Sequence, residues 1–322
     1  MSIPLSVIKT RIGEKAQENS SNVLNKLVSY INRFYEQLWN NFNWKEITVI
    51  DEPLVLVSGE VVQVLPRYCA QIITITSRAI GAILQPSSPF VYQQKYLGDL
   101  ASSSSPLAYT EAGRSAIKTN LSTADTISLV SDSISDVHIV RVSGKDSNGL
   151  FRSDPITLTG TTQADGVITF AQDSIVDIVG AQLSTGIISI KETTSGNTLD
   201  YLSPEDYKNQ YLKISLAGPS DAENTVYISY KERFRPMRYD EDSPWFPCDD
   251  ALILYGYAQI LKMRSKFDQA LSVEGKASEL VAAMVAEREI LGNDYEQTIP
   301  KVSVSYVDQP YFSSNFNIGG AK

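Results

Sequence analysis

The sequence predicts an α+β protein in which a helical domain with accessory strands is interrupted by an inserted β-sandwich and followed by an extended tail. Three observations predict this fold class: helical spacing of apolar residues near both ends of the chain, short alternating runs in its middle, and a final stretch without helical pattern. The expected boundaries are residues 1–119 and 226–300 for the split helical domain, 120–230 for the insert and 301–322 for the tail. A continuous domain inserted into a discontinuous one is the simplest arrangement of this order.

The first predicted element is an amphipathic helix over residues 21–43, because apolar side chains recur there three and four positions apart. These side chains are Leu24, Leu27, Val28, Ile31, Phe34, Tyr35, Leu38, Trp39 and Phe42. Past Trp44 the pattern changes to extended runs such as KEITVID, LVLVSGEVVQVLP and CAQIITITS. Trp39, Phe42 and Trp44 fall at this change. We interpret them first as a packing joint between helix and sheet.

The middle of the chain predicts a β domain. Residues 98–118 are rich in small and polar side chains and are typical of a linker or exposed loop. From residue 121 to 230, short β-like runs such as VHIVRVSG, PITLTG, GIISIKET, YLKISL and TVYISY alternate with turn signals such as KDSNG and TSGN. This rhythm is typical of a β-sandwich of immunoglobulin type. We expect residues 120–230 to fold as an isolated fragment.

Helices return after an acidic, proline-rich bend, RPMRYDEDSPWFPCDD. Two helical patterns follow, and Asp249 and Asp268 are expected to cap two antiparallel helices. The terminal stretch TIPKVSVSYVDQPYFSSNFNIGGAK is extended and aromatic, and it ends in glycines. A short tail of this kind cannot bury its own aromatic side chains, so it is expected to dock on its own chain or on a neighbour.

Composition limits the class of protein. The chain has 322 residues, 43% of them hydrophobic, which is enough for a sizeable core. No window approaches the roughly 20 apolar residues of a membrane span, and the amino terminus lacks the layout of a secretory signal. We therefore expect a protein that is made and used in a cytoplasm, or in an assembly built there, and that contacts no membrane. The net charge of −9 is concentrated in residues 120–230, where 6 basic and 14 acidic side chains give −8. Such a chain is poorly suited to grip DNA, although it suits a passage through which DNA slides.

Residues with catalytic or redox potential are few. Cys69 and Cys248 are the only cysteines, and we expect them to be buried free thiols. His138 is the only histidine; it lies in an alternating run, and no nucleophile or orienting acid is suggested beside it. No nucleotide-binding, zinc-protease or hydrolase motif is present. We therefore expect a protein that is not an enzyme and that uses no cofactor.

Carboxylates near the bend allow two interpretations. Asp240, Glu241 and Asp242, with Asp249 and Asp250 shortly after them, would suit a divalent cation. Alternatively, the first three lie on a solvated turn, and the other two begin a helix whose dipole favours negative charge. KDSNG at residues 145–149 resembles part of a calcium loop but lacks its alternating ligands and closing glutamate, so we predict a turn.

Two sets of side chains are candidates for an interface. Lys231, Arg233 and Arg235 alternate in YKERFRPMR and would share one face of a continuing strand, either to contact phosphates or an acidic partner or to form a solvated edge. The tail aromatics are the second set, since they would fill pockets of a neighbouring subunit. They are Tyr306, Tyr311, Phe312 and Phe316.

The order of these segments resembles the head-to-tail adaptor, or connector, proteins of tailed bacteriophages. The resemblance covers residues 20–97 and 226–295: a helix ending in LWNNFNWKEIT, a strand closing in VVQVLPRY, a strand VYISYKERF, the bend DEDSPWFP and two long helices. The individual motifs are weak, and their order carries the resemblance. An insert of the predicted size departs from the smallest members of this family.

The resemblance implies a structural virion protein that forms a ring, commonly of twelve copies, below the portal. Its implied partners are further copies of the chain, the portal protein, the next tail component and DNA that passes without sequence-specific binding. Trp39, Phe42 and Trp44 would then lock helix to sheet within each subunit and face the adjoining one. The alternative is a carbohydrate- or receptor-binding phage protein acting through the β-sandwich. A hydrolase is a third possibility, for which no constellation of residues was found.

Overall fold

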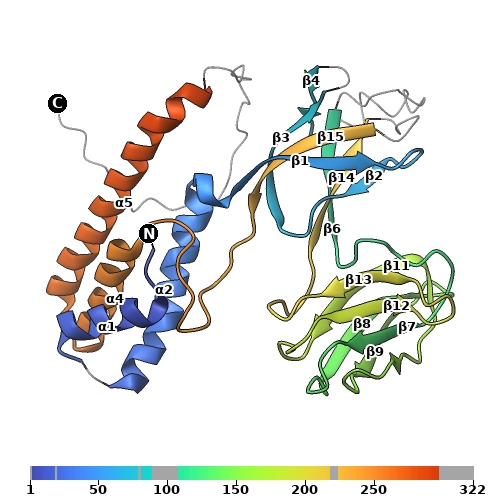
Figure 1. Cartoon of the computed structure of the whole chain (residues 1–322), viewed down its shortest axis with the longest axis horizontal. Helices are drawn as coiled ribbons and strands as arrows, with labels where there is room; N and C mark the ends of the chain where they lie inside the picture. The colour runs from blue at the N-terminus through green and yellow to red at the C-terminus, as the bar shows by residue number, and fades with distance from the viewer. Residues whose placement is uncertain (1, 19, 79–80, 89–107, 218–223, 297–322) are drawn as a thin grey trace. The chain divides into compact units, whose positions relative to one another are not determined.

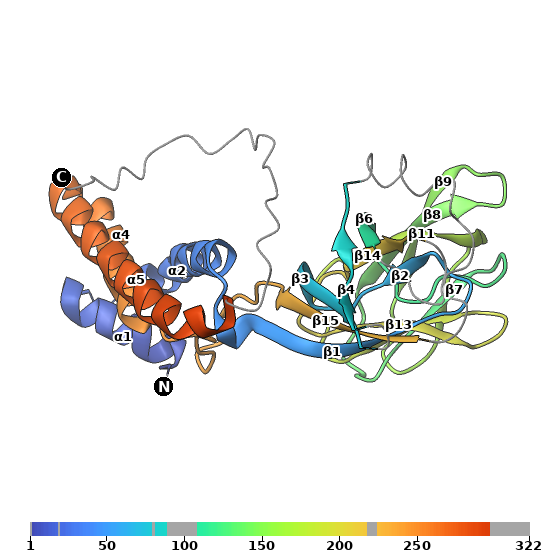
Figure 2. The same ribbon diagram turned by 90° about the horizontal axis from the view of Figure 1, so that it is seen from above.

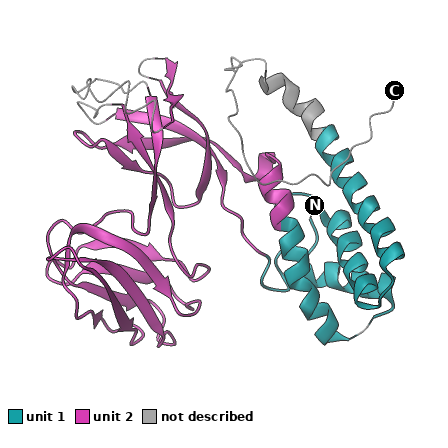
Figure 3. Ribbon diagram, turned by 180° about the vertical axis from the view of Figure 1, so that it is seen from behind, with its two compact units in different colours: residues 1–35, 237–322 teal, residues 36–236 magenta. Residues whose placement is uncertain are grey.

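The structure is a computed structural model that describes residues 2–18, 20–78, 81–88, 108–217 and 224–296. It divides into two compact units, residues 1–35 with 237–322 and residues 36–236, called here the helical unit and the β unit (Figure 3). The helices are α1 (Leu5–Ala16), α2 (Ser21–Asn41), α4 (Asp249–Met263) and α5 (Phe267–Glu296), with a 3₁₀ turn η1 (Lys45–Ile47). The boundary between the units falls within α2.

The fifteen strands of the described residues all lie in the β unit. They are β1 (Thr48–Leu56), β2 (Val62–Val64), β3 (Cys69–Ser77), β4 (Ala82–Ile83), β5 (Gln85–Pro86), β6 (Ala108–Ser115), β7 (Ile127–Ser131), β8 (Ile139–Asp146), β9 (Phe151–Thr157), β10 (Ala164–Asp165), β11 (Phe170–Gly180), β12 (Ile188–Glu192), β13 (Thr198–Leu202), β14 (Tyr211–Leu216) and β15 (Asn224–Glu232).

The helical unit is built around α4, which is buried on most of its surface. Apolar side chains of α1 at spacings of three and four, namely Leu5, Ile8 and Ile12, are fully buried, and α2 buries Leu27 and Ile31 in the same way. α4 and α5 run antiparallel, side by side (Figures 1 and 2). Ala258 and Leu261 of α4 and Ala270 of α5 pack together. Burial of these stripes is the main stabilising contribution to the helical unit.

A glycine permits the closest approach between helices. A Cβ atom at Gly256 of α4 would lie 2.4 Å from Cδ1 of Ile12 and 3.7 Å from Cγ1 of Ile31. Both isoleucines are fully buried, so they have little room to move aside. Gly256 therefore allows α1 and α2 to pack directly on the backbone of α4.

The β unit contains four small sheets that form two cores. The first two have the strand orders β1-β15-β3-β4 and β2-β14-β6-β5, and the inward side chains of β15, Val226, Ile228 and Tyr230, share a core with Ile214 of β14. The other two have the orders β10-β7-β12-β13 and β11-β8-β9, and they enclose a second core (Figure 1). We call these the upper sheets and the lower sheets, after their places in Figure 1.

The predicted fold class is wrong. Strand residues make up 37% of the structure and helical residues 28%, and the four sheets do not form a helical domain with an immunoglobulin-like insert. The upper strands are not accessories to helices, because their inward side chains pack on a facing sheet. Two runs assigned to the insert, YLKISL and TVYISY, become β14 and β15, which pair with β2 and β6 and with β1 and β3.

Individual helices were predicted with mixed success. α2 begins at the expected residue and ends two positions early, and two antiparallel helices follow the bend as expected. The prediction that Asp249 caps α4 is wrong: Cys248 holds that position without a side-chain hydrogen bond, and Asp249 lies in the first turn. Asp268 lies in the first turn of α5. α1 was not predicted, although Leu5, Ile8 and Ile12 have helical spacing.

Candidate functional site

Trp39 and Trp44 form a buried joint at the end of α2. The indole N–H of Trp39 donates to the carbonyl of Glu232 over 2.9 Å, and its ring meets Phe234 edge-on at 5.7 Å. The indole N–H of Trp44 donates to the carbonyl of Leu38 over 2.9 Å. Both side chains are almost inaccessible to solvent. The aromatic group is therefore a packing joint between helix and sheet, as the sequence predicts.

Phe42 completes this joint. Its ring packs edge-on against Trp44 with centroids 5.6 Å apart, and it is half-buried. Trp39 and Trp44 are buried within their own chain, so Phe42 is the member of the three that keeps exposed surface.

Lys231 is not on an exposed basic face. Only 4% of it is exposed, and its ammonium donates to the carbonyls of Asn40 and Phe42 over 3.0 and 2.9 Å. Burial lowers the pKa of Lys231. The ammonium satisfies carbonyl groups that the end of α2 leaves without helical partners. This side chain attaches β15 to the end of α2.

Arg233 and Arg235 lie beyond the end of β15 and contact a different segment. The backbone N–H of Arg233 donates to the carbonyl of Tyr68 over 2.7 Å, and the guanidinium of Arg235 lies 4.2 Å from the centre of the Tyr68 ring. Arg235 also forms an ion pair with Glu232 at 3.6 Å. Lys231 therefore contacts the end of α2, whereas Arg233 and Arg235 contact Tyr68, because the strand ends at Glu232.

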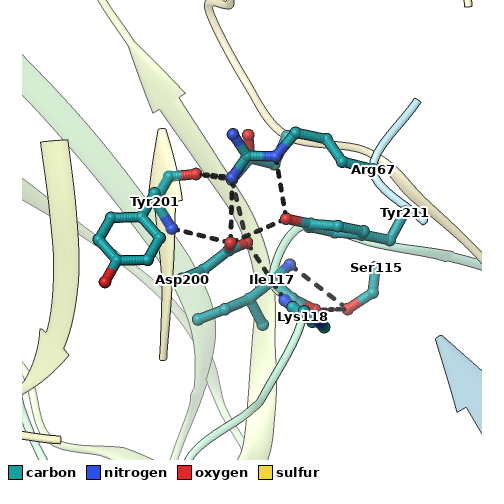
Figure 4. A network of polar contacts seen from close by, with 8 residues as sticks. Arg67, Ser115, Ile117, Lys118, Asp200, Tyr201 and Tyr211 are labelled. Atoms are coloured by element: carbon teal, nitrogen blue, oxygen red, sulfur yellow. Dashed lines mark hydrogen bonds and ion pairs between the residues drawn. The ribbon is translucent and has the colours of Figure 1, made fainter. Parts of the chain in front are cut away.

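A buried polar network connects the upper and lower sheets (Figure 4). The Arg67 guanidinium donates to the hydroxyl of Tyr211 over 3.1 Å, to a carboxylate oxygen of Asp200 over 3.1 Å and to the carbonyl of Tyr201. The Tyr211 hydroxyl donates to Asp200 over 2.8 Å. Asp200 belongs to β13 of the lower sheets and Tyr211 to β14 of the upper sheets. The network therefore fixes one pair of sheets to the other.

Asp200 is the centre of this network. Its second carboxylate oxygen accepts hydrogen bonds from the Lys118 backbone N–H over 3.2 Å and from the Asn209 side chain over 3.0 Å. Burial raises the pKa of Tyr211, and the neighbouring charge of Asp200 raises it further. Burial alone would lower the pKa of Arg67, but Tyr211 and Asp200 raise it. Sequence reasoning missed this network, because its members are far apart in the chain.

His138 lies at the start of β8 beside another buried carboxylate. Asp136 accepts from the Ser131 hydroxyl over 2.6 Å and from the backbone N–H groups of Thr185 and Gly186 over 2.7 and 3.0 Å. Burial would raise the pKa of Asp136, but these hydrogen bonds outweigh it and lower the pKa. Neither ring nitrogen of His138 has a hydrogen-bond partner within the described part of the chain. The Asp136 carboxylate therefore connects two loops at one end of the lower sheets.

The acidic bend holds the start of α1. The carbonyls of Asp242 and Asp240 accept from the backbone N–H groups of Leu5 and Ser6 over 2.7 and 3.0 Å. These are donors that the helix itself leaves unpaired. The Asp242 carboxylate accepts from two backbone N–H groups of the bend, and that of Asp240 pairs with Lys9. The acidic bend, which the sequence predicts as a solvated turn, therefore also binds the first turn of α1.

The other carboxylates near the bend, Asp249, Asp250 and Glu241, were considered both as cation ligands and as groups on a solvated turn and a helix start. The Asp249 carboxylate accepts from the backbone N–H of Ile3 over 3.2 Å, and burial raises its pKa. Asp250 and Glu241 lie nearby in the sequence. Among the residues that the structure describes, no group of three or more His, Cys, Asp or Glu side chains is arranged to hold a metal ion.

Three smaller predictions can be compared with the structure. Residues 145–149 form the predicted turn, in which Asp146 accepts from the backbone N–H groups of Asn148 and Leu150 over 2.9 and 3.0 Å. Cys69 and Cys248 are buried free thiols, as predicted, and burial raises the pKa of Cys69 to about 12. No described helix has the length and apolar character needed to cross a membrane. Tyr306, Tyr311, Phe312 and Phe316 lie outside the described residues.

Comparison with known proteins did not identify a family. No protein-family model matches the chain, and a search of curated proteins returned no match.

Proposed function

We propose that this chain is a structural virion protein, a head-to-tail adaptor of a tailed bacteriophage, that forms a ring below the portal. The observation that supports it most is that strands from the two stretches of the resemblance, residues 20–97 and 226–295, pair with each other in the β unit. β15 pairs with both β1 and β3, and Trp39 and Lys231 join α2 to the same strand and the residue after it. Parts of both stretches, which resemble the family only by their order, are therefore packed together within the β unit.

The proposed role as a ring subunit requires a fixed shape and binding surfaces rather than catalytic residues. A ring subunit must keep its geometry when neighbours bind on both sides, and buried joints with satisfied hydrogen bonds provide that rigidity. The joint at Trp39 and the network at Asp200 both serve this purpose within the β unit. We propose that DNA passes through the lumen of the ring without sequence-specific contacts, since a chain of net charge −9 repels phosphates.

The proposed partners are further copies of this chain, the portal protein and the next tail component. We propose a closed ring with heterologous contacts, in which one surface of each subunit binds a different surface of the next. Assembly takes place in the cytoplasm of the host bacterium, and the finished protein belongs to the portal vertex of the virion.

Electron microscopy of particles labelled with an antibody against this chain tests the proposal. We expect label at a single vertex, between the capsid and the tail, where an antibody against the portal protein also binds. The portal antibody is the control for access to that vertex. Label at the tail tip, on fibres or over the whole capsid would contradict the adaptor role.

A further inference from the structure

Four arginines from three segments of the chain lie near the start of β14. Arg67 contacts Tyr211, and Arg235 stacks on the adjacent Tyr68. Arg114 of β6 donates to the side-chain oxygen of Gln210 over 2.9 Å, and the Arg233 guanidinium donates to the backbone carbonyl of the same residue. Gln210 directly precedes Tyr211, so one short stretch of backbone brings Arg67, Arg114 and Arg233 together, while Arg235 contacts Tyr68 beside Arg67.

Two of the four arginines are neutralised within the chain. Arg67 forms an ion pair with Asp200 at 3.1 Å, and Arg235 forms one with Glu232 at 3.6 Å. In both cases a carboxylate on a neighbouring strand or turn compensates a partly buried guanidinium, as is usual for such groups.

Arg114 and Arg233 form no such ion pair with any residue that the structure describes. Their shared partner, Gln210, supplies two amide oxygens, which accept hydrogen bonds but carry no net charge. Within the described residues, neither guanidinium has a carboxylate within ion-pair distance, although Glu111 and Asp206 belong to the same region. Burial lowers the pKa of Arg233, Asp206 partly offsets this, and the like charge of Arg114 lowers the pKa further. Two like charges close together favour binding of an anion.

We infer that Arg114 and Arg233 form a carboxylate-binding site for a second copy of this chain, and this inference rests on the ring assembly of the proposed function. Two adjacent guanidiniums offer several N–H donors in the planar arrangement that suits an oxyanion. The pair would be one half of a heterologous contact, with an acidic surface of the next subunit as the other half.

Charge complementarity identifies the occupant. Residues 120–230 carry a net charge of −8, with 6 basic and 14 acidic side chains. Asp132, Asp165 and Asp173 are exposed and form no ion pair with any described residue. A copy of the chain therefore presents both a cationic pair without an ion-pair partner and exposed carboxylates without one, which are complementary groups for a heterologous contact.

Carbodiimide cross-linking of the assembled full-length chain tests the inference. Arg114→Lys and Arg233→Lys keep the positive charge and introduce amines that this reagent couples to a carboxylate in direct contact. Subunits labelled with heavy and light nitrogen are mixed before assembly, so that a cross-link between copies has a mixed-isotope mass. Arg78→Lys is the matched control, because Arg78 is exposed and pairs with Asp51 of its own chain at 3.3 Å, so its product should be intrachain.

We expect mixed-isotope cross-links from positions 114 and 233 to carboxylates within residues 120–230. We also expect Arg114→Glu, at the exposed member of the pair, to weaken self-association by about tenfold or more while thermal unfolding remains close to that of the parent chain.

Three results would overturn the inference. If a ring forms but positions 114 and 233 give no cross-links between copies, the site is wrong and the adaptor proposal stands. If no ring forms with or without the portal protein, both fail. If Arg114→Gln with Arg233→Gln abolishes binding of short duplex DNA but leaves assembly unchanged, the occupant is a nucleic acid rather than a copy of the chain.

Discussion

Different kinds of interaction stabilise the interior of the helical unit and the interior of the β unit. In the helical unit, α4 packs through apolar side chains and through the bare backbone at Gly256. In the β unit, buried carboxylates accept hydrogen bonds from backbone N–H groups of surrounding loops. Asp125, Asp136, Asp154, Glu192 and Asp200 all have this role.

The difference follows from the elements involved. A helix satisfies its own backbone apart from its ends, so its packing depends mainly on apolar surface. Short strands in small sheets leave many loop N–H groups without strand partners, and a buried carboxylate with several acceptor sites satisfies two or three at once. We therefore expect packing changes to be most damaging in the helical unit and the loss of a carboxylate to be most damaging in the β unit.

The largest expected effect is that of Asp200→Ala. The substitution leaves the partly buried Arg67 guanidinium without its carboxylate and removes the acceptor for Tyr211, so we expect a loss of about 3–5 kcal/mol in the free energy of unfolding. Hydrogen exchange followed by mass spectrometry should show the loss of protection in β13 and β14. Asp165→Ala is the control, since this carboxylate is exposed and its change should be nearly neutral. Equal effects at both positions would contradict the role of the network.

A smaller effect is expected from Gly256→Val in the helical unit. The new side chain would overlap Ile12, and overpacking of a dense core costs about 1–3 kcal/mol. Gly275→Val is the matched control in α5, where a Cβ atom meets nothing within 4 Å, and its thermal unfolding should be nearly unchanged. A similar loss for both variants would contradict the role of close packing at Gly256, since valine has a higher helix propensity than glycine at either position.

The smallest expected difference between the two units is in how much stability each loses at acidic pH. Hydrogen bonds outweigh the opposing effect of burial and lower the pKa values of Asp125 and Asp136, and hydrogen bonds lower that of Glu192. The unfolded chain therefore binds protons at these groups first, and their stabilisation is complete above about pH 4.5 and is lost as the pH falls through the lowered values. Burial raises the pKa of Asp249 in the helical unit and that of Glu232 in the β unit, so acid relieves the cost of burying these two charges.

Brief pepsin digestion between about pH 4.5 and 2.5 measures this difference, because the protease is active in that range. We expect the first acid-dependent cuts within the described residues to fall in the lower sheets, before any in α4. First cuts in α4, with the lower sheets still protected, would contradict the predicted order.

Local patterns in the sequence predicted some of these elements well. The periodicity around Leu27 and Ile31 predicted α2, because one helical face needs only neighbouring residues to define it. α1 has the same kind of signal but is short and interrupted by charged residues, and it depends on the distant bend to satisfy its first N–H groups.

Pairing over long distances was not predictable in this way. Alternation identified the runs that became β14 and β15 but not their partner strands. These partners lie about 100 residues earlier in the sequence for β6, and about 150 residues or more for β1, β2 and β3. Lys231 was expected on an exposed face because its burial depends on carbonyls at the end of α2, about 190 residues earlier. The contact between Arg67 and Asp200 has no local signal at all.

Native mass measurement of the purified chain, alone and with the portal protein of the same phage, tests the central claim most directly. The adaptor account predicts that a closed ring of one fixed copy number forms with the portal, and the family resemblance indicates twelve copies. A chain that stays monomeric in the presence of the portal protein, or that binds it as a single copy, would contradict the account.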